Sequence, residues 1–314
     1  MSHDESPVSS DYLPVVYFDG SFVDIASARI PVTTHALHYG TGVFEGIRSY
    51  GDGDRAWIFR ARDHYERLLR NAALLQMVPR HTVDESIGLT VELLRRNDAC
   101  ADTYIRPLLY NNTEHIGAGL NSDCALTIMA VRSARAPAPR APLRTDFSRW
   151  RRFPSASCPA GAKITGLYIN SSLARGDAQA RGYDQPILLT TAGQVSEGFG
   201  ANLFAVFGRR IVTPPPEADI LAGITRRTLL DHLARMPDYR VSEEHIDPDA
   251  LTSADELFFC GTGMEITPIG SIGDVPIGDG AVGPVTTRLA IWYRAVVTHE
   301  VVPDSSLYTA VHRD

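Results

Sequence analysis

Apolar residues recur along this chain at two spacings, and each spacing predicts a different kind of element. In "ARDHYERLLRNAALLQM" (61–77) they stand three or four residues apart, which is the spacing of an amphipathic helix. "VDESIGLTVELLRRN" (83–97) shows the same spacing. The runs 103–111 and 125–131 are rich in strand-forming residues, and "VVYFDGSFVDI" predicts two strands joined by a tight turn at Asp19-Gly20. The first half therefore has the mixture of elements found in an α+β domain.

The second half alternates the two kinds of pattern. Strand-like runs occupy 185–191, 202–208 and 256–261, and helical runs occupy 169–182, 225–236 and 285–300. This alternation predicts a mixed α/β domain. Between the halves, "ARAPAPRAP" (134–142) repeats proline at a spacing that neither a helix nor a central strand accommodates. That segment predicts an extended linker.

A chain of 314 residues has the length of about two domains. The patterns predict a small α+β domain over 14–133, a linker over 134–143 and a larger mixed α/β domain over 144–314. The start, "MSHDESPVSSDYLP", is polar and acidic, unlike a signal or transit peptide. We expect residues 1–13 to be a disordered lead-in.

Composition narrows the class of protein. With 44% hydrophobic and 21% charged residues, the chain has the make-up of a soluble globular protein. Its net charge of −7 disfavours a nucleic-acid binder, and no apolar run approaches the ~20 residues of a membrane-spanning helix. The four cysteines are scattered without a Cys-x-x-Cys pair. That pattern favours reduced, buried thiols in a cytoplasmic protein over a disulfide framework or a zinc site.

Lys163 is the only lysine in the chain, and the other 29 of its 30 basic residues are arginine. Arginine serves as well as lysine as a surface cation, but it cannot lose its proton near neutrality and so cannot act as an amine nucleophile. A lysine can do so once burial or a neighbouring cation lowers its pKa. The exception therefore indicates a position where the amine itself matters. The alternative is a surface lysine left by chance, and its neighbours must decide between the two.

Other segments carry groups that suit a phosphorylated ligand. Tyr168 follows Lys163 by five residues, at the edge of a helical run, and Glu197 stands in a turn whose two glycines, Gly198 and Gly200, suit a close approach of the backbone to a ligand. The segment Gly223-Ile224-Thr225 at a helix start and the segment Gly261-Thr262-Gly263 at a strand end each predict a backbone anion site. Arg67 would add a guanidinium for a phosphate.

An amine, a carboxylate, a tyrosine and anion sites are what pyridoxal phosphate requires. Its aldehyde needs a lysine, its ring nitrogen needs an acid and its phosphate needs an anchor. Taken singly, each feature has a plainer explanation, because a glutamate in a glycine turn is usually solvated and a tyrosine usually packs. His35 and His38 are three residues apart and invite a metal site, but no third ligand stands at suitable spacing, which favours structural hydrogen bonds.

From about residue 14 to its end, the chain resembles the branched-chain amino-acid aminotransferases of the class IV family, which are fold-type IV pyridoxal-phosphate enzymes. Seven blocks in the order typical of the family carry the resemblance: "THALHYGTGVFEGIR" (34–48), "HYERL" (64–68), "TYIRPL" (103–108), "AKITGLYINS" (162–171), "SEGFGANLF" (196–204), "LAGITR" (221–226) and "GTGMEITP" (261–268). The resemblance implies a two-domain fold, pyridoxal 5'-phosphate as cofactor and a homodimer or larger homo-oligomer.

The resemblance also implies a role for each matching residue. Lys163 would form the Schiff base with the cofactor and move the proton during transfer. Tyr168 would bind the ring hydroxyl and Glu197 the ring nitrogen. The phosphate would be held by Arg67, Ile224, Thr225 and Thr262. The substrate would be bound by Tyr39, Phe44, Gly46, Tyr104, Arg106, Thr262 and Gly263, of which the last two supply N–H groups to its carboxylate. The implied reaction is a ping-pong transfer of the amino group of a hydrophobic L-amino acid to 2-oxoglutarate.

Two departures from the family pattern leave the substrate open. The linker, "RSARAPAPRAP" (132–142), has no aromatic residue and three arginines where relatives are aromatic and glycine-rich, and Ala118 stands where a larger apolar residue is typical. Both changes would widen or polarise the pocket and suit a larger or more polar substrate in a specialised pathway.

Two rival functions on the same fold are a lyase similar to aminodeoxychorismate lyase and a binding protein without catalytic activity. The block "YIRP" favours amino transfer over the lyase reaction. The presence of Lys163, Tyr168 and Glu197 together argues against a protein without activity.

Overall fold

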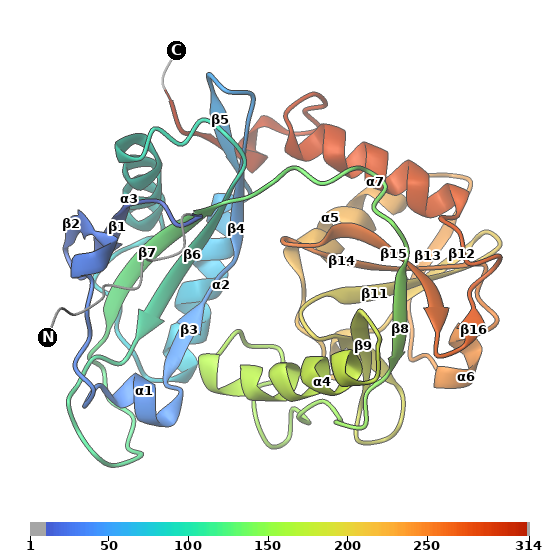
Figure 1. The fold of residues 1–314 in the computed structure, drawn as a ribbon, viewed down its shortest axis with the longest axis horizontal. Helices are drawn as coiled ribbons and strands as arrows, with labels where there is room; N and C mark the ends of the chain where they lie inside the picture. The colour runs from blue at the N-terminus through green and yellow to red at the C-terminus, as the bar shows by residue number, and fades with distance from the viewer. Residues whose placement is uncertain (1–10, 313–314) are drawn as a thin grey trace, which may run out of the picture. The chain divides into compact units, whose positions relative to one another are not determined.

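The structure is a computed structural model that describes residues 11–312, and these form two compact units. Among the described residues, unit 1 comprises 11–135, 164–166 and 297–312, and unit 2 comprises 136–163 and 167–296. Figure 1 shows the fold with its elements labelled. No helix within the described residues is both long and apolar enough to cross a membrane.

Unit 1 is built on an antiparallel sheet in the order β17-β5-β4-β6-β7-β1-β2, with β3 added on β6. Two helices, α2 and α3, pack on one face of this sheet (Figure 1). The strands are β1 Val15–Phe18, β2 Ser21–Asp24, β3 Gly42–Phe44, β4 Ile47–Gly51, β5 Ala56–Phe59, β6 Thr103–Tyr110, β7 Ala125–Arg132 and β17 Tyr308–Ala310. The helices are α1 His35–Tyr39, α2 Ala61–Leu74 and α3 Val83–Arg96, with short 3-10 turns at Ile25–Ser27 and Ser305–Leu307.

Strand β6 shows how the sheet of unit 1 separates a core face from a second face. Its odd-numbered residues, such as Ile105 and Leu109, are fully or almost fully buried, whereas Tyr104, Arg106 and Leu108 are only half-buried. Successive side chains of a strand point to opposite faces, so the odd residues form the core under the helices and the even ones form the opposite face.

The two helices of unit 1 have the sequence signals that predicted them. Helix α3 begins with a capping box, in which the Thr82 hydroxyl accepts the N–H of Glu85 and the Glu85 carboxylate accepts the N–H of Thr82. Helix α2 buries Tyr65 and Leu68 completely. The predictions of an amphipathic helix over 61–77 and of a second over 83–97 are confirmed, with α2 ending three residues early.

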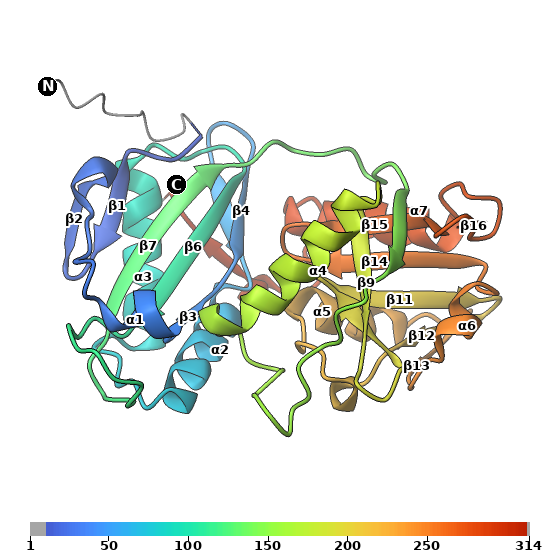
Figure 2. The ribbon, with the colours of Figure 1, turned by 60° about the horizontal axis from the view of Figure 1, so that its bottom comes forward.

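Unit 2 is built on a mixed sheet in the order β10-β9-β8-β15-β14-β11-β12-β13, with β16 on the edge of β15. Helix α4 runs along β9 (Figure 2), and α5 packs against β13 and β14. The strands are β8 Leu143–Phe147, β9 Gln185–Leu189, β10 Val195–Gly198, β11 Asn202–Phe207, β12 Arg210–Thr213, β13 Arg240–Glu243, β14 Glu256–Gly261, β15 Glu265–Ile272 and β16 Val275–Pro276. The helices are α4 Tyr168–Ala180, α5 Ile224–Leu233, α6 Pro248–Leu251 and α7 Pro284–Val297, with 3-10 turns at Thr165–Leu167 and Pro216–Ala218.

The core of unit 2 lies on the central strands of its sheet. Strands β11 and β14 are buried along almost their whole length, which is why both are runs of apolar residues with no polar alternation. Phe204 and Phe258 stack on each other with ring centroids 5.2 Å apart. The strands predicted at 185–191, 202–208 and 256–261 and the helices predicted at 169–182, 225–236 and 285–300 are present in unit 2, within a few residues of the predicted bounds.

Three details differ from the sequence predictions. The segment around Glu197 is strand β10 and not a turn, because Val195 and Gly198 pair with β9. Most of the predicted lead-in lies outside the described residues, but Leu13 is 2% exposed and donates its N–H to Ala130 O, so disorder was the wrong expectation there. The C-terminal segment and 164–166 belong to unit 1, whereas 144–314 was expected to be one domain, because β17 pairs with β5 and Ile164 bridges to Val43.

Candidate active site

Lys163 lies in unit 2, in the loop that leads through the 3-10 turn Thr165–Leu167 into helix α4. Its Nζ donates a hydrogen bond to the hydroxyl of Tyr168, the first residue of α4, over 2.5 Å. The lysine is half-buried, between the buried Ala162 and Ile164. The five-residue spacing in the sequence thus becomes a direct contact, because the turn and the first helical residue fold back on the loop.

Glu197 is buried in unit 2 and is held by three donors. Its Oε1 pairs with Nη2 of Arg152 at 2.9 Å, and its Oε2 accepts from Asn202 Nδ2 at 3.0 Å and from the N–H of Leu221 at 3.1 Å. Burial raises the pKa of Glu197 above its ordinary value, and the charge of Arg152 opposes that rise, as does the charge of Lys163. The arrangement supplies a carboxylate held in one place, which suits binding of a cationic ring nitrogen.

Helix α5 begins at Ile224, and its N-terminus has no side-chain cap. Ile224 and Thr225 are buried there. The preceding residue, Gly223, has no room for a side chain, because a β-carbon would lie 2.1 Å from Oδ1 of Asn202. Free N–H groups at a helix start attract anions, so this helix start has the chemistry to hold a phosphate, as the sequence predicts.

Thr262 and Gly263 lie in the turn that joins β14 to β15, where Gly261 pairs with Glu265. The linker reaches this turn, since Nη2 of Arg140 donates to the carbonyl of Gly263 at 3.3 Å. Glu265 leaves the turn with a positive φ of 53° and forms an ion pair with Arg294. The second predicted anion site is therefore a tight turn with charged side chains around it.

Arg67 lies on α2 in unit 1 and forms a buried two-point ion pair with Glu45. Its Nε is 2.6 Å from Glu45 Oε1 and its Nη2 is 2.8 Å from Glu45 Oε2, to which Nδ1 of His64 also bonds at 2.8 Å. Burial alone would raise the pKa of Glu45, but the guanidinium of Arg67 holds it well below its ordinary value. The guanidinium is thus fixed in orientation, as a phosphate ligand must be.

Four of the predicted substrate residues form one cluster in unit 1. Nη2 of Arg106 donates to the hydroxyl of Tyr104 at 3.0 Å, and the guanidinium lies 4.6 Å from the ring centroid of Phe44. Gly46 completes the cluster, because a β-carbon on it would lie 2.1 Å from the Tyr104 hydroxyl. The cluster offers an aromatic wall and one fixed cation, which can bind a substrate that is partly apolar and carries a negative charge.

Tyr39 belongs to a different part of unit 1. It ends helix α1, is 38% exposed, and its hydroxyl accepts the N–H of Gly117, next to Ala118. The two histidines of this region are hydrogen-bonded to the protein itself, His35 to Thr41 and Gly117 and His38 to the carbonyl of Val32. Within residues 11–312 no group of three His, Cys, Asp or Glu side chains is placed to hold a metal ion.

Sequence reasoning missed the residues that orient the predicted ones. Glu45 lies inside the block 34–48, but the sequence indicated no role for it, nor for Arg152 or Asn202. The only sequence signal for Arg152 is its position on the approach to Lys163, in "RWRRFPSASC", which does not distinguish it from Arg149 or Arg151. Partners that lie far apart in the sequence become visible only in the fold.

The residues of unit 2 fit pyridoxal phosphate. An amine bonded to a tyrosine hydroxyl, a buried carboxyl group paired with an arginine and an uncapped helix start preceded by Gly223 match the aldehyde, the ring nitrogen and the phosphate of that cofactor.

Comparison with known proteins agrees with this chemistry. Residues 42–272 match the family model for amino-transferase class IV. A probable branched-chain-amino-acid aminotransferase of Aquifex aeolicus is 37% identical over 88% of this chain and 90% of its own length. The branched-chain-amino-acid aminotransferase of Escherichia coli K12 is 34% identical over 91% of this chain and 93% of its own.

Solved structures show the same fold. The branched-chain aminotransferase of Thermoproteus uzoniensis with norvaline superposes with a TM-score of 0.89 at 37% identity and covers 95% of this chain and 99% of its own. The branched-chain amino acid aminotransferase of Thermobaculum terrenum in its PLP-form has a TM-score of 0.89 at 32% identity, over 96% of this chain and 100% of its own.

These matches extend over nearly the whole chain and confirm the expected fold, in which both units mix helices and strands. They also confirm the expected cofactor, pyridoxal 5'-phosphate. The chain therefore belongs to the class IV aminotransferase family, among the branched-chain-amino-acid aminotransferases, and is a pyridoxal-phosphate-dependent aminotransferase.

Proposed function

We propose that the protein transfers the amino group of a branched-chain L-amino acid to 2-oxoglutarate by a ping-pong reaction. The observation that carries this proposal is the contact of Lys163 Nζ with the Tyr168 hydroxyl, in the same unit as the buried carboxylate of Glu197. The relatives support the substrate class, since curated relatives from Aquifex aeolicus and Escherichia coli bear that activity in their names.

Each residue of the site has a task in this reaction. Pyridoxal phosphate supplies an aldehyde that carries the amino group and a ring that withdraws electrons. Lys163 would hold the cofactor through Nζ, and as a free amine it would take the proton from the substrate Cα and deliver it to the carbon that carried the cofactor's aldehyde. The Tyr168 hydroxyl, which accepts a hydrogen bond from Nζ, would bind the ring hydroxyl. Glu197 binds the ring nitrogen.

The remaining residues hold the two ends of the reacting molecule. In unit 2, the N–H groups of Ile224 and Thr225 bind the phosphate, with Thr262. In unit 1, Arg67 presents the fixed guanidinium expected of a phosphate ligand. The substrate carboxylate is bound at the turn Thr262-Gly263. In unit 1, the residues proposed to bind substrate are Phe44, Gly46, Tyr104, Arg106 and Tyr39.

Replacement of the lysine tests this function. Lys163→Arg keeps the positive charge but removes the amine, so we expect loss of the visible absorption of bound cofactor together with loss of turnover. Because the chain has no other lysine, borohydride reduction followed by peptide mass spectrometry should fix the cofactor on residue 163 alone. Arg149→Lys adds an exposed lysine as a control that should not become labelled. Turnover that persists in Lys163→Arg would contradict the proposal.

A larger or more polar substrate remains a second candidate, and the linker favours it. Arg140 is bonded to the carbonyl of Gly263, so a cationic side chain stands beside the turn assigned to the substrate carboxylate. A panel of amino donors with 2-oxoglutarate as acceptor decides between the candidates. Highest kcat/KM with valine, leucine and isoleucine supports the branched-chain assignment, whereas a preference for polar or larger donors supports the second one.

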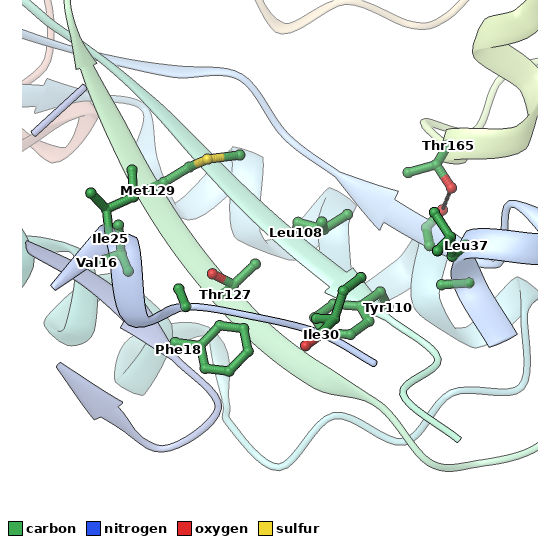
Figure 3. A pocket seen from close by; sticks show the side chains of 13 residues that line it. Val16, Phe18, Ile25, Ile30, Leu37, Leu108, Tyr110, Thr127, Met129 and Thr165 are labelled. Carbon is green, nitrogen blue, oxygen red and sulfur yellow. Dashed lines mark hydrogen bonds between the residues drawn. The ribbon is translucent and has the colours of Figure 1, made fainter. Parts of the chain in front are cut away.

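We also propose that the protein is a homodimer in the cytoplasm. Unit 1 has an apolar groove of about 370 Å³ on the sheet face opposite α2 and α3 (Figure 3). Leu108 and Tyr110 line this groove, and they follow Tyr104 and Arg106 on the same face of β6. Ile30 and Leu37 on its rim are 45% and 60% exposed. A second copy of the chain would cover this apolar face beside the substrate residues. The four cysteines are free thiols, which agrees with a reducing compartment, but Cys100 and Cys158 are only half-buried, so the expectation of buried thiols holds for Cys124 and Cys260 alone.

A further inference from the structure

One buried guanidinium connects three segments of unit 2 that carry or adjoin proposed cofactor ligands. Nη2 of Arg152 pairs with Glu197 Oε1 at 2.9 Å and also donates to the carbonyl of Ala160 at 3.1 Å. Its Nε donates to the carbonyl of Asp219 at 3.1 Å. Ala160 lies three residues before Lys163, and Asp219 lies in the turn before α5. A single side chain thus connects strand β10 to the loop that contains Lys163 and to the turn that precedes helix α5.

Arg152 is itself firmly placed. It is 9% exposed, and its N–H donates to the carbonyl of Leu189 at the end of β9. Its neighbour Arg151 is exposed. Two adjacent arginines therefore have opposite environments, and only the buried one reaches the site.

The groups that face Glu197 come from five segments. Arg152 supplies the direct ion pair, and Asn202 Nδ2 and the N–H of Leu221 are neutral donors. Lys163 and Arg226 add two more distant positive charges. The pKa of the Cys260 thiol is raised by burial and, to a smaller extent, by the charge of Glu197. Arg152 is the only one of these that is both charged and in contact.

We propose that Arg152 is a positioning residue that holds Glu197 as a carboxylate and thereby keeps the proton shared by Glu197 and the cofactor's ring nitrogen on the nitrogen. This rests on the proposed function, in which Glu197 binds that nitrogen.

The physical reason is the competition of two bases for one proton. A buried glutamate without a cation beside it gains proton affinity, because burial disfavours its charged form. Glu197 would then compete with the ring nitrogen for the proton, and a ring without that proton withdraws electrons poorly. Arg152 lowers the proton affinity of the carboxylate, and an arginine cannot lose its own charge near neutrality.

The first experiment locates the proton directly. Wild-type holoenzyme, Arg152→Gln, Arg152→Lys and the exposed control Arg151→Gln are loaded with cofactor labelled with 15N in the ring, and the 15N chemical shift is measured against pH. We expect the protonated value for wild type and Arg151→Gln from neutral to alkaline pH, and a shift toward the unprotonated value in Arg152→Gln. A protonated value in Arg152→Gln equal to that of wild type overturns the proposal.

Arg152→Lys keeps the result decisive if Arg152→Gln does not fold. Lysine supplies the charge at neutral pH, but a buried lysine loses its proton at a lower pH than a free one. We therefore expect a protonated ring at neutral pH and an unprotonated ring at alkaline pH in this variant. A ring nitrogen whose 15N shift follows the wild-type pH profile in Arg152→Lys also overturns the proposal.

The second experiment uses the apoprotein and does not depend on the cofactor. Because burial raises the pKa of Glu197, the folded state binds more protons than the unfolded state between the ordinary pKa of a glutamate and the raised one. Stability is lost as the pH rises through that window, and removal of Arg152 extends the window upward. We expect the melting temperature of apo Arg152→Gln, relative to Arg151→Gln, to fall further as the pH rises from about 4.5 toward 8. If Arg152→Gln does not fold, the melting temperature of apo Arg152→Lys relative to Arg151→Gln is measured over the same pH range.

The two experiments separate this proposal from the proposed function. If the melting temperatures of apo Arg152→Gln and apo Arg151→Gln change with pH in the same way, the proposed role of Arg152 is wrong, even if the holoenzyme transfers amino groups. A melting temperature that falls more steeply with pH in apo Arg152→Gln supports the pairing of Arg152 with Glu197. If the wild-type protein also fails to attach the cofactor, the proposed function is contradicted instead.

Discussion

Gly46 and the hydroxyl of Tyr104 share one small space in unit 1, since a β-carbon built on Gly46 would lie 2.1 Å from the Tyr104 oxygen. The glycine is therefore required by its neighbour and not by its own backbone, which has no positive φ. The same hydroxyl accepts a hydrogen bond from Arg106. The position of the cation in this cluster thus depends on the absence of a side chain at residue 46.

Gly46→Ala should displace the Tyr104 ring and, with it, Arg106. We expect kcat/KM for the amino donor to fall by roughly 10- to 100-fold, mostly through KM, because small misplacements of positioning groups have effects of that size. Gly88→Ala is the control, since a β-carbon on that exposed residue of α3 meets no atom within 4 Å. It should leave kinetics unchanged and stabilise the helix by about 0.5–1 kcal/mol. Unchanged KM in Gly46→Ala would show that this cluster does not bind substrate.

Tyr168→Phe removes the hydroxyl that accepts from Lys163. A hydrogen bond to a charged group contributes about 1.5–3 kcal/mol, so we expect kcat to fall by roughly 10- to 100-fold while the cofactor stays bound. Single-turnover kinetics and the absorption spectrum measure the two effects separately. Tyr183→Phe, just beyond the end of α4, is the matched control and should behave as wild type. A Tyr168→Phe enzyme with wild-type kcat would refute a role of this contact in the reaction.

Glu45→Gln should destabilise unit 1, because it leaves the buried charge of Arg67 without its carboxylate. The expected loss is about 3 kcal/mol near neutral pH. The folded-state pKa of Glu45 lies well below its ordinary value, so its stabilisation is present above about pH 4.5 and is lost as the pH falls further. The gap between wild type and variant in urea unfolding should therefore narrow in acid.

The control for that experiment is Glu92→Gln on α3. Glu92 also pairs with an arginine, Arg96, but both side chains are 42% or more exposed. Solvent screens such a pair, so we expect a change within about 0.5 kcal/mol. A Glu45→Gln variant as mild as Glu92→Gln would mean that the buried pair does not stabilise the fold.

Gly223→Ala should weaken cofactor binding in unit 2, because it changes the helix start proposed to hold the phosphate. The new methyl group would push on Oδ1 of Asn202, whose amide nitrogen donates to Glu197. We expect the dissociation constant of the cofactor to rise by about tenfold or more, from the loss of a hydrogen bond to a charged group. Gly200→Ala, in the same region and with nothing within 4 Å of its β-carbon, should bind the cofactor normally. Equal affinities of the two variants, measured by equilibrium dialysis, would contradict this.

Leu37→Glu tests the proposed dimer. Leu37 is exposed on the rim of the apolar groove, so a charge there should prevent a second copy from covering the groove while leaving the fold intact. Light scattering should give about twice 34.3 kDa for wild type and a single-chain mass for the variant. Val78→Glu places a charge on an equally exposed apolar residue that does not line the groove, and it should stay dimeric. A dimeric Leu37→Glu protein would place the interface elsewhere.

Elements whose pattern is local were predictable from the sequence. Helices α2 and α3 follow from the spacing of their apolar residues and, for α3, from the Thr82–Glu85 capping box. The contact of Lys163 with Tyr168 spans five residues, and the sequence alone suggested that the two belong together. Strand β17 could not be predicted in this way, because its three residues have a strand conformation only through pairing with β5.

The sequence by itself determined the chemical groups of the candidate site, namely the amine of Lys163, the hydroxyl of Tyr168 and the carboxyl of Glu197. Its motif blocks also indicated the family. The tertiary structure alone decided which groups orient these side chains. Glu45 meets Arg67 across 22 residues, and Arg152 reaches Asp219 across 67. The reason is that charged side chains are buried only where a partner compensates the loss of water, and such partners are brought together by the packing of the sheets, which no local pattern records.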